Sequence, residues 1–159
     1  FCEHKNLYGF EGEVPESSYT IPLGEASVAR DGKDLSIITY GLMVHRALDA
    51  AAELAKEGID VEIVDLRCLS PLDLDTVLDS VTKTGRVVCV DEANPRCSIA
   101  SDISSLVVQH AFSALKSGIE MVTPPHVPVP FSPVLEDLYI PSAAQIASAA
   151  RKVMKGAHQ

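Results

Sequence analysis

The sequence predicts a three-layer, doubly wound α/β domain with a mostly parallel sheet. Short β-rich segments alternate with helical segments from residue 35 onward, a pattern typical of parallel strands joined by crossover helices. The segment 86–90 is apolar after its first residue, as expected for a strand buried on both faces. The length of 159 residues suits one domain of ordinary size with a substantial core.

Local signals predict the individual elements. The first β-rich run ends at Gly41, and Gly58 follows the first helical segment as a C-cap. Ser70 is a suitable N-cap for a second helix with Pro71 at its first position. The predicted strands are 35–40, 61–66, 86–90 and 119–123, with a short strand near 26–29, and the predicted helices are 44–56, 71–82, 99–115 and 143–155.

Two parts of the chain differ in composition. Residues 1–34 are mixed and rich in Gly and Pro, which predicts an extended connector that enters the domain. Residues 35–159 form the predicted domain. Because the chain opens with Phe1 rather than Met, we expect it to be a fragment of a longer protein.

Charge and composition narrow the functional classes. The net charge of −9 argues against nucleic-acid binding and is compatible with a basic protein partner. The sequence shows no membrane span or signal peptide. The four cysteines form no CxxC pair, which argues against a zinc site or a disulfide framework and favours the cytoplasm.

No fingerprint of a nucleotide site or of a hydrolase is present. The chain lacks GxGxxG, GxxxxGK[ST] and GxSxG motifs. In doubly wound sheets, functional loops follow the carboxyl ends of the strands. The loops so predicted are 41–44, 67–72, 91–98 and 124–133.

Polar residues end two of the predicted strands. Asp91 and Glu92 could perform acid–base chemistry, but Glu92 more plausibly caps the helix near Ile99 or pairs with a neighbouring loop. Asp65 and Arg67 end the preceding strand. The Arg67 guanidinium could bind a carboxylate or phosphate, or pair with Asp65, Asp91 or Glu92.

His126 lies in a proline-rich loop. Four prolines within residues 124–130 fix the backbone, so the loop can present one side chain accurately. A supporting or interface role for His126 is favoured over a catalytic one, because rigid proline-rich segments commonly build protein contacts.

An ordered series of motifs resembles the beta subunits of thiamine-diphosphate-dependent 2-oxo acid dehydrogenases. Residues 65–73 (DLRCLSPLD), 80–86 (SVTKTGR) and 90–92 (VDE) resemble the transketolase-like C-terminal domain of the pyruvate, branched-chain 2-oxo acid and acetoin dehydrogenases. Residues 3–24 resemble the exit from a preceding pyrimidine-binding domain. Residues 128–141 resemble the closing loop of the family, and residues 123–139 are most similar to acetoin-type subunits.

The resemblance implies a domain for assembly rather than catalysis. The implied whole enzyme decarboxylates a 2-oxo acid oxidatively and transfers the acyl group to lipoamide, using thiamine diphosphate and magnesium. The motifs that hold this cofactor are absent here, so the resemblance implies no catalytic, cofactor or metal residue in this chain and no activity of the fragment alone. Asn94–Ser98 and His126 depart from the usual family pattern and leave the substrate open.

The resemblance also implies partners. These are an alpha subunit, a second beta subunit and the small basic subunit-binding domain of the dihydrolipoyl acyltransferase, with no nucleic acid and no membrane. Glu120 lies near the acidic docking position of the family, with Met154 beside it, although Glu120 could equally be one solvated carboxylate among many. For self-association we expect contributions from Phe131, His126 and the rest of the loop 124–131, and from Leu42, Met43 and His45.

Two other functions stay open at this point. The chain could be the C-terminal domain of a transketolase or a deoxyxylulose-phosphate synthase. It could also be a free-standing binding module that reuses the fold.

Overall fold

A five-stranded mixed sheet forms the centre of the computed structural model, which describes residues 2–156. The strand order is β1-β3-β2-β4-β5. Strands β2 to β5 are parallel, whereas β1 runs antiparallel to β3 at one edge, with an irregularity between Val28 and Arg30. The strands are β1 (Ser27–Arg30), β2 (Leu35–Thr39), β3 (Val61–Asp65), β4 (Val87–Val90) and β5 (Glu120–Val122).

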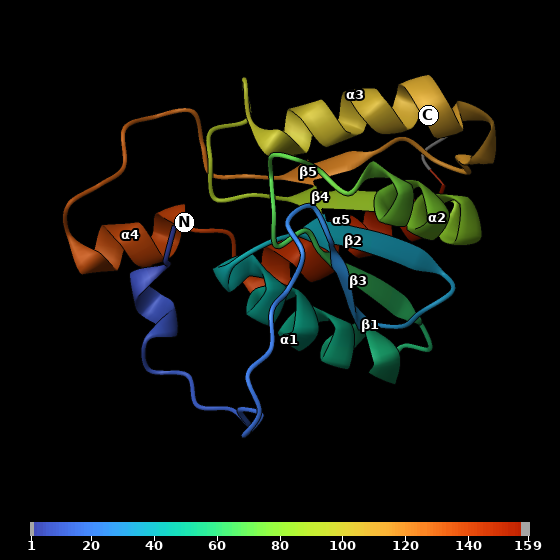
Figure 1. Cartoon of the computed structure of the whole chain (residues 1–159). Coiled ribbons are helices and arrows are strands. Elements are labelled where there is room, and N and C mark those ends of the chain that lie inside the picture. The colour runs from blue at the N-terminus through green and yellow to red at the C-terminus, as the bar shows by residue number, and fades with distance from the viewer. Residues whose placement is uncertain (1, 157–159) are drawn as a thin grey trace.

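Four helices cover the two faces of this sheet (Figure 1). α1 (Leu42–Lys56) and α5 (Ala143–Met154) pack on one face, and α2 (Leu74–Thr84) and α3 (Ile99–Ala111) pack on the other. Successive strand residues point to opposite faces, so Ile37 joins the core under α1 and α5 while Ile38 joins the core under α2 and α3. All four residues of β4 are buried, as predicted for an interior strand. The predicted fold class is confirmed.

Helix α2 begins three residues later than predicted. Ser70 and Pro71 are joined by a cis peptide bond outside the helix, and the N-cap is Asp73. The Asp73 carboxylate accepts hydrogen bonds from the Thr76 backbone N–H at 3.1 Å and from the Ala26 backbone N–H at 2.9 Å. The prediction of Ser70 as the cap was therefore wrong.

The third predicted helix is shorter than expected. α3 ends at Ala111 and is followed by the 3-10 turn η2 (Phe112–Ala114). Two further elements were not predicted: the 3-10 turn η1 (Lys5–Leu7) and the helix α4 (Pro133–Tyr139). Within α4 only Tyr139 is buried.

Residues 2–26 form an N-terminal arm that precedes β1. Leu7 of the arm packs against the core cluster under α1 and α5. The Phe10 ring lies 4.2 Å, centroid to centroid, from the His45 ring of α1. No helix among the described residues is long and apolar enough to cross a membrane.

Candidate functional site

Asp91 is the fully buried residue at the carboxyl end of β4. Its carboxylate accepts hydrogen bonds from the Tyr40 hydroxyl at 2.8 Å, the Ala93 N–H at 2.9 Å and the Ala100 N–H at 3.3 Å. Burial, followed by the contact with Asp91, raises the pKa of the Tyr40 phenol well above its usual range. Because its oxygens are occupied by donors from three segments, Asp91 anchors the loop before α3 and is not free for acid–base chemistry.

Glu92 is half-buried and faces the N-terminal arm. Its two carboxylate oxygens lie 3.3 and 3.1 Å from Nε2 of His4. Burial raises the pKa of Glu92, and the nearby His4 and Arg46 act in the opposite direction. Glu92 does not cap α3, because Ser98 does so by accepting from the Ser101 N–H at 3.3 Å. The alternative prediction, a pairing with a neighbouring segment, matches the structure.

The side chain of Asp65 bonds to the backbone of Arg67, not to its guanidinium. The Asp65 carboxylate accepts from the Arg67 N–H at 3.1 Å, and Arg67 adopts a left-handed φ of 52° with its side chain exposed. Within residues 2–156, no hydrogen bond or ion pair joins Asp65 or Arg67 to Asp91 or Glu92. The four predicted polar residues therefore form two separate pairs rather than one cluster.

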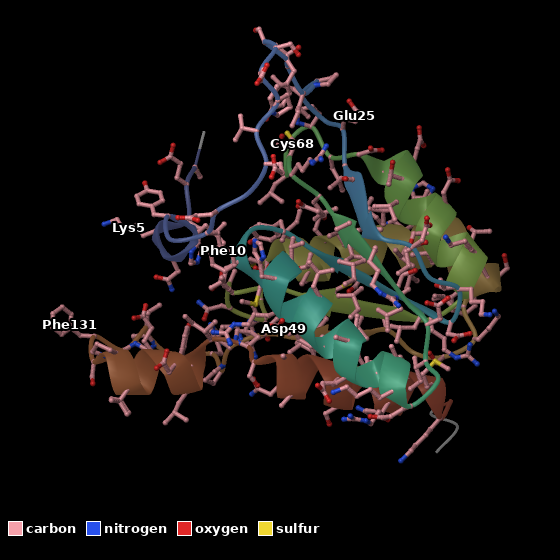
Figure 2. All side chains as sticks on the ribbon, turned by 90° about the horizontal axis from the view of Figure 1, so that it is seen from below. Lys5, Phe10, Glu25, Asp49, Cys68 and Phe131 are labelled. Carbon is pink, nitrogen blue, oxygen red and sulfur yellow. The ribbon has the colours of Figure 1, made fainter. Side chains whose placement is uncertain are left out.

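Phe131 projects from the molecule beside α4 (Figure 2). Its side chain is fully exposed. Neighbouring apolar side chains of the loop and of α4 are also at least half exposed. We call this set the α4 surface: Val127, Val129, Phe131, Val134, Leu135 and Leu138.

The loop that carries the α4 surface is tied down at one point. The Tyr139 hydroxyl donates to the Val127 carbonyl at 3.3 Å. His126 of this loop is exposed, and no hydrogen bond or ion pair involves it in the described part of the chain. Exposed apolar side chains on a fixed backbone are typical of a protein contact.

Two residues expected at an interface belong to the core instead. Leu42 is 6% exposed and Met43 is 1% exposed, because both lie on the face of α1 that packs on the sheet. They cannot contribute to self-association. His45 stays partly exposed and contacts Phe10.

Glu120 begins β5, as predicted, and is paired with α5. Its carboxylate lies 2.7 Å from Nζ of Lys152. Met154 is the last residue of α5 and is partly buried against the core. Glu120 is thus already partly neutralised by this chain.

The sequence did not predict an ion pair that involves the buried carboxylate of Glu62. Glu62 in β3 is 2% exposed and pairs with Lys83 of α2, and its carboxylate also receives the Gly32 N–H. Contact with Glu62 raises the pKa of Lys83. A charged residue inside the apolar run 61–64 was the available signal, since such a charge requires a partner.

No group of three or more His, Cys, Asp or Glu side chains within residues 2–156 could hold a metal ion. The four cysteines are free thiols, of which Cys89 is buried. The conspicuous features of this domain are therefore the buried anchor Asp91, the arm contact at Glu92 and the α4 surface.

The family model described as "Transketolase, C-terminal domain" matches residues 24–146. The chain belongs to this family. A solved structure titled "Split gene transketolase, inactive beta4 tetramer" has a TM-score of 0.76 and 26% sequence identity, and the match covers 91% of this chain and 46% of that one. Membership in the family and the likeness to this structure agree with the predicted domain type.

Curated relatives are named as dehydrogenase and oxidoreductase beta subunits. The chain is 78% identical over 156 residues to acetoin:2,6-dichlorophenolindophenol oxidoreductase subunit beta of Cupriavidus necator, covering 98% of this chain and 46% of the relative. It is 51% identical to the subunit of the same name in Bacillus subtilis, covering 93% of this chain and 43% of that subunit. It is 47% identical to pyruvate dehydrogenase E1 component subunit beta of Bacillus subtilis, covering 98% of this chain and 48% of that subunit.

The chain thus spans about half the length of the curated relatives it matches. The predicted resemblance to the C-terminal domain of these beta subunits is confirmed. The roles of the site residues and the boundary between connector and domain at residue 34 stay predictions. Residue 1 of the predicted connector and residues 157–159 of the predicted domain lie outside the described residues.

Proposed function

We propose that this chain is the assembly domain of a thiamine-diphosphate-dependent oxidoreductase beta subunit of the acetoin or pyruvate type. The 78% sequence identity to an acetoin oxidoreductase beta subunit favours the acetoin type. The observation that carries the assembly role is the α4 surface. It exposes Phe131 and Leu138 on a segment that is held to the domain chiefly at its end.

In the proposed complex the partners are an alpha subunit and a second beta subunit. Obligate interfaces of this kind typically bury about 2,000 Å² or more and are rich in apolar side chains. Phe131 and the exposed residues of α4 would supply such side chains. A cytoplasmic location is part of the proposal, in keeping with the free thiols of this chain.

The residues of this chain do not fit thiamine diphosphate with magnesium. The described residues offer no metal-ligand cluster, and the carboxylate of Asp91 is already satisfied within the protein. The cofactor of the proposed enzyme would bind outside this domain, so no chemical step is assigned to residues of this chain. Titration calorimetry with thiamine diphosphate and Mg²⁺ should show no binding tighter than about millimolar, roughly −4 kcal/mol.

The activity is tested on the whole protein that contains this chain, co-expressed with an alpha subunit. We expect reduction of 2,6-dichlorophenolindophenol with acetoin as substrate, and less with pyruvate or branched-chain 2-oxo acids. The double variant Phe131→Ser/Leu138→Ser should fail to assemble and lose activity. A fully active complex that carries this variant would contradict the assembly role, and inactivity toward the entire panel would contradict the enzyme class.

An acyltransferase subunit-binding domain is the further partner that we propose, at Glu120. Two observations support this partner. The chain has a negative net charge, and the Glu120 carboxylate stays partly exposed although it pairs with Lys152. Glu120→Lys should weaken binding of the assembled complex by about 1 kcal/mol or more, because it replaces a carboxylate that attracts the basic partner with an ammonium that repels it. The weakening should shrink at high salt, where exposed charges are screened within about 8 Å or less.

Surface plasmon resonance at low and high salt measures this effect. Glu53→Lys is the matched control, since Glu53 is an exposed acid of α1 paired with Lys56 at 2.7 Å. Equal affinity of wild type and Glu120→Lys, without salt dependence, would exclude Glu120 from the docking site.

A further inference from the structure

The N-terminal arm crosses the carboxyl edge of the sheet at a distinctive place. The strand order reverses between β2 and β4, and in doubly wound sheets this switch point is where ligands usually bind. Tyr40 follows β2 there, and Asp91 and Glu92 follow β4. In this chain, His4 of the arm reaches Glu92 at this point.

Three contacts hold the first part of the arm to the domain. Leu7 packs on the core, the Phe10 ring packs at a tilt against the His45 ring, and His4 pairs with Glu92. Beside these contacts, an open pocket of about 400 Å³ lies between the arm and α1. Figure 2 shows Phe10 of the arm near the start of α1, whereas Lys5 points away from the domain. The pocket is lined by Asn6, Phe10, Leu42, His45, Arg46, Leu48 and Asp49.

The backbone of η1 depends on these contacts. The N–H groups of Leu7, Tyr8 and Phe10 bond only to carbonyls of the arm itself, at 2.9, 3.2 and 3.0 Å. An isolated turn of this length is unstable in water. These three amides are therefore protected from solvent exchange only while the arm is held against the domain.

His4–Glu92 is the one ion pair between the arm and the domain within residues 2–156. The groups that face it are Tyr40 and Asp91 from the sheet edge and Arg46 and His45 from α1. On the arm itself, Glu3 is engaged with the Tyr8 hydroxyl at 2.6 Å. The Arg46 guanidinium keeps its positive charge throughout, so Glu92 is the group at this contact whose change of charge matters.

We propose that His4 and Glu92 form a proton-dependent latch that sets how firmly the arm is held on the domain. The latch is closed while Glu92 is ionised and pairs with His4. It weakens in acid when Glu92 takes up a proton, and burial, which raises the pKa of Glu92, brings this change closer to neutral pH. The next step rests on the proposed function, in which the arm connects this domain to another domain of the whole beta subunit. There the latch would also govern the angle between this domain and the other one.

Hydrogen–deuterium exchange of the 159-residue chain tests the latch without reference to enzyme activity. Protection of the amides of residues 7, 8 and 10, corrected for intrinsic exchange, should be about twofold to fivefold higher at pH 7 than at pH 4, as for a partly exposed ion pair. Glu92→Gln and His4→Gln should abolish this difference, whereas His4→Lys should keep it, because a lysine can still pair with ionised Glu92.

Two control variants complete the design. Glu3→Gln removes an acid of the same arm that does not touch the domain, and it should leave the pH response unchanged. His45→Gln should lower protection at both pH values but keep the response. A pH-independent wild type, or a response that persists in Glu92→Gln and vanishes in His45→Gln, would overturn the latch.

Discussion

Gly32 lies where the turn between β1 and β2 passes closest to β3. A Cβ at this position would sit 2.2 Å from the Val61 carbonyl carbon and 2.3 Å from the Glu62 nitrogen. Because both atoms are backbone, the sheet edge would have to move. Gly32→Ala should therefore lower the free energy of unfolding by about 1–3 kcal/mol, as overpacking does elsewhere.

Urea denaturation measures this loss. Gly118→Ala is the control, since a Cβ there meets no atom within 4 Å. If the two variants had the same denaturation midpoint, the close approach of Gly32 to β3 would be wrong.

Cys89 and Tyr40 make the fold sensitive to alkali. Burial raises the pKa of the Cys89 thiol to about 12, and burial together with Asp91 raises the pKa of the Tyr40 phenol. In the unfolded chain these groups ionise near about 8.5 and 10. Between these values and the folded pKa values, the folded state keeps protons that the unfolded state releases. The contribution of these groups to the free energy of unfolding is therefore fully present below about pH 8.5 and is lost as pH rises toward the folded pKa values. The loss is up to about 1.4 kcal/mol per pH unit for each group.

Urea denaturation at pH 7, 8.5 and 9.5 is the corresponding measurement. Cys89→Ala should flatten the fall between pH 8.5 and 9.5, whereas Cys2→Ala should not, because Cys2 is exposed. An equal fall in both variants would mean that the thiol of Cys89 does not contribute.

Asp73 decides where helix α2 begins. Ser70 was the predicted cap, because proline is favoured at the first helical position and Pro71 follows it. In the structure the cap is Asp73, whose carboxylate also receives the Ala26 N–H and so ties the arm to α2. A contact across 47 residues is not visible to a local rule.

Replacement of Asp73 by Ala should cost about 1–2 kcal/mol, since the cap and the Ala26 bond are lost together. These bonds lower the pKa of Asp73, so its contribution is present above the unfolded pKa of about 3.9 and disappears as pH falls through the folded value. Thermal unfolding at pH 7 and pH 3 checks both points. Asp75→Ala removes an exposed acid of the first turn that is not the N-cap, so it should cost less and is the control.

Helix α4 shows the opposite failure. Its sequence begins with Pro133 after a proline-rich loop, and it buries only Tyr139. Its apolar residues Val134, Leu135 and Leu138 do follow helical spacing, but seven residues after a proline-rich loop are too few for the periodicity to decide. The interior strands β2 and β4 were predictable because each is a short, fully buried and mostly apolar block. Longer elements that pack on the core are visible in the sequence, whereas a short helix whose apolar side chains are exposed is not.

At the scale of the whole molecule, alternating strands and helices were enough to predict the three layers. They were not enough to predict which loop residues meet. His4 and Glu92 are 88 positions apart, and Asp91 turned out to be an anchor because three donors from separate segments converge on it. The sequence therefore pointed to the individual residues of the candidate site but not to which of them contact one another. Contacts between distant segments follow from the folded topology.

The α4 surface has a consequence for the isolated chain. Apolar patches this exposed are uncommon on stable monomers and are usually covered by another protein. In isolation, the 159-residue chain should self-associate through this surface, and apolar anchors at the centre of such contacts are often worth about 2 kcal/mol or more. Phe131→Ser/Leu138→Ser should therefore raise the dissociation constant by about thirtyfold or more.

Sedimentation velocity over about a hundredfold range of concentration, wide enough to cross such a change in affinity, measures this self-association. Phe112→Ser is the matched control, because Phe112 is also a largely exposed aromatic residue but lies in η2 after α3. The control should associate like the wild type, since its aromatic ring is outside the α4 surface. A wild-type chain that stays monomeric throughout, or a double variant that associates as strongly as Phe112→Ser, would show that the α4 surface does not drive assembly.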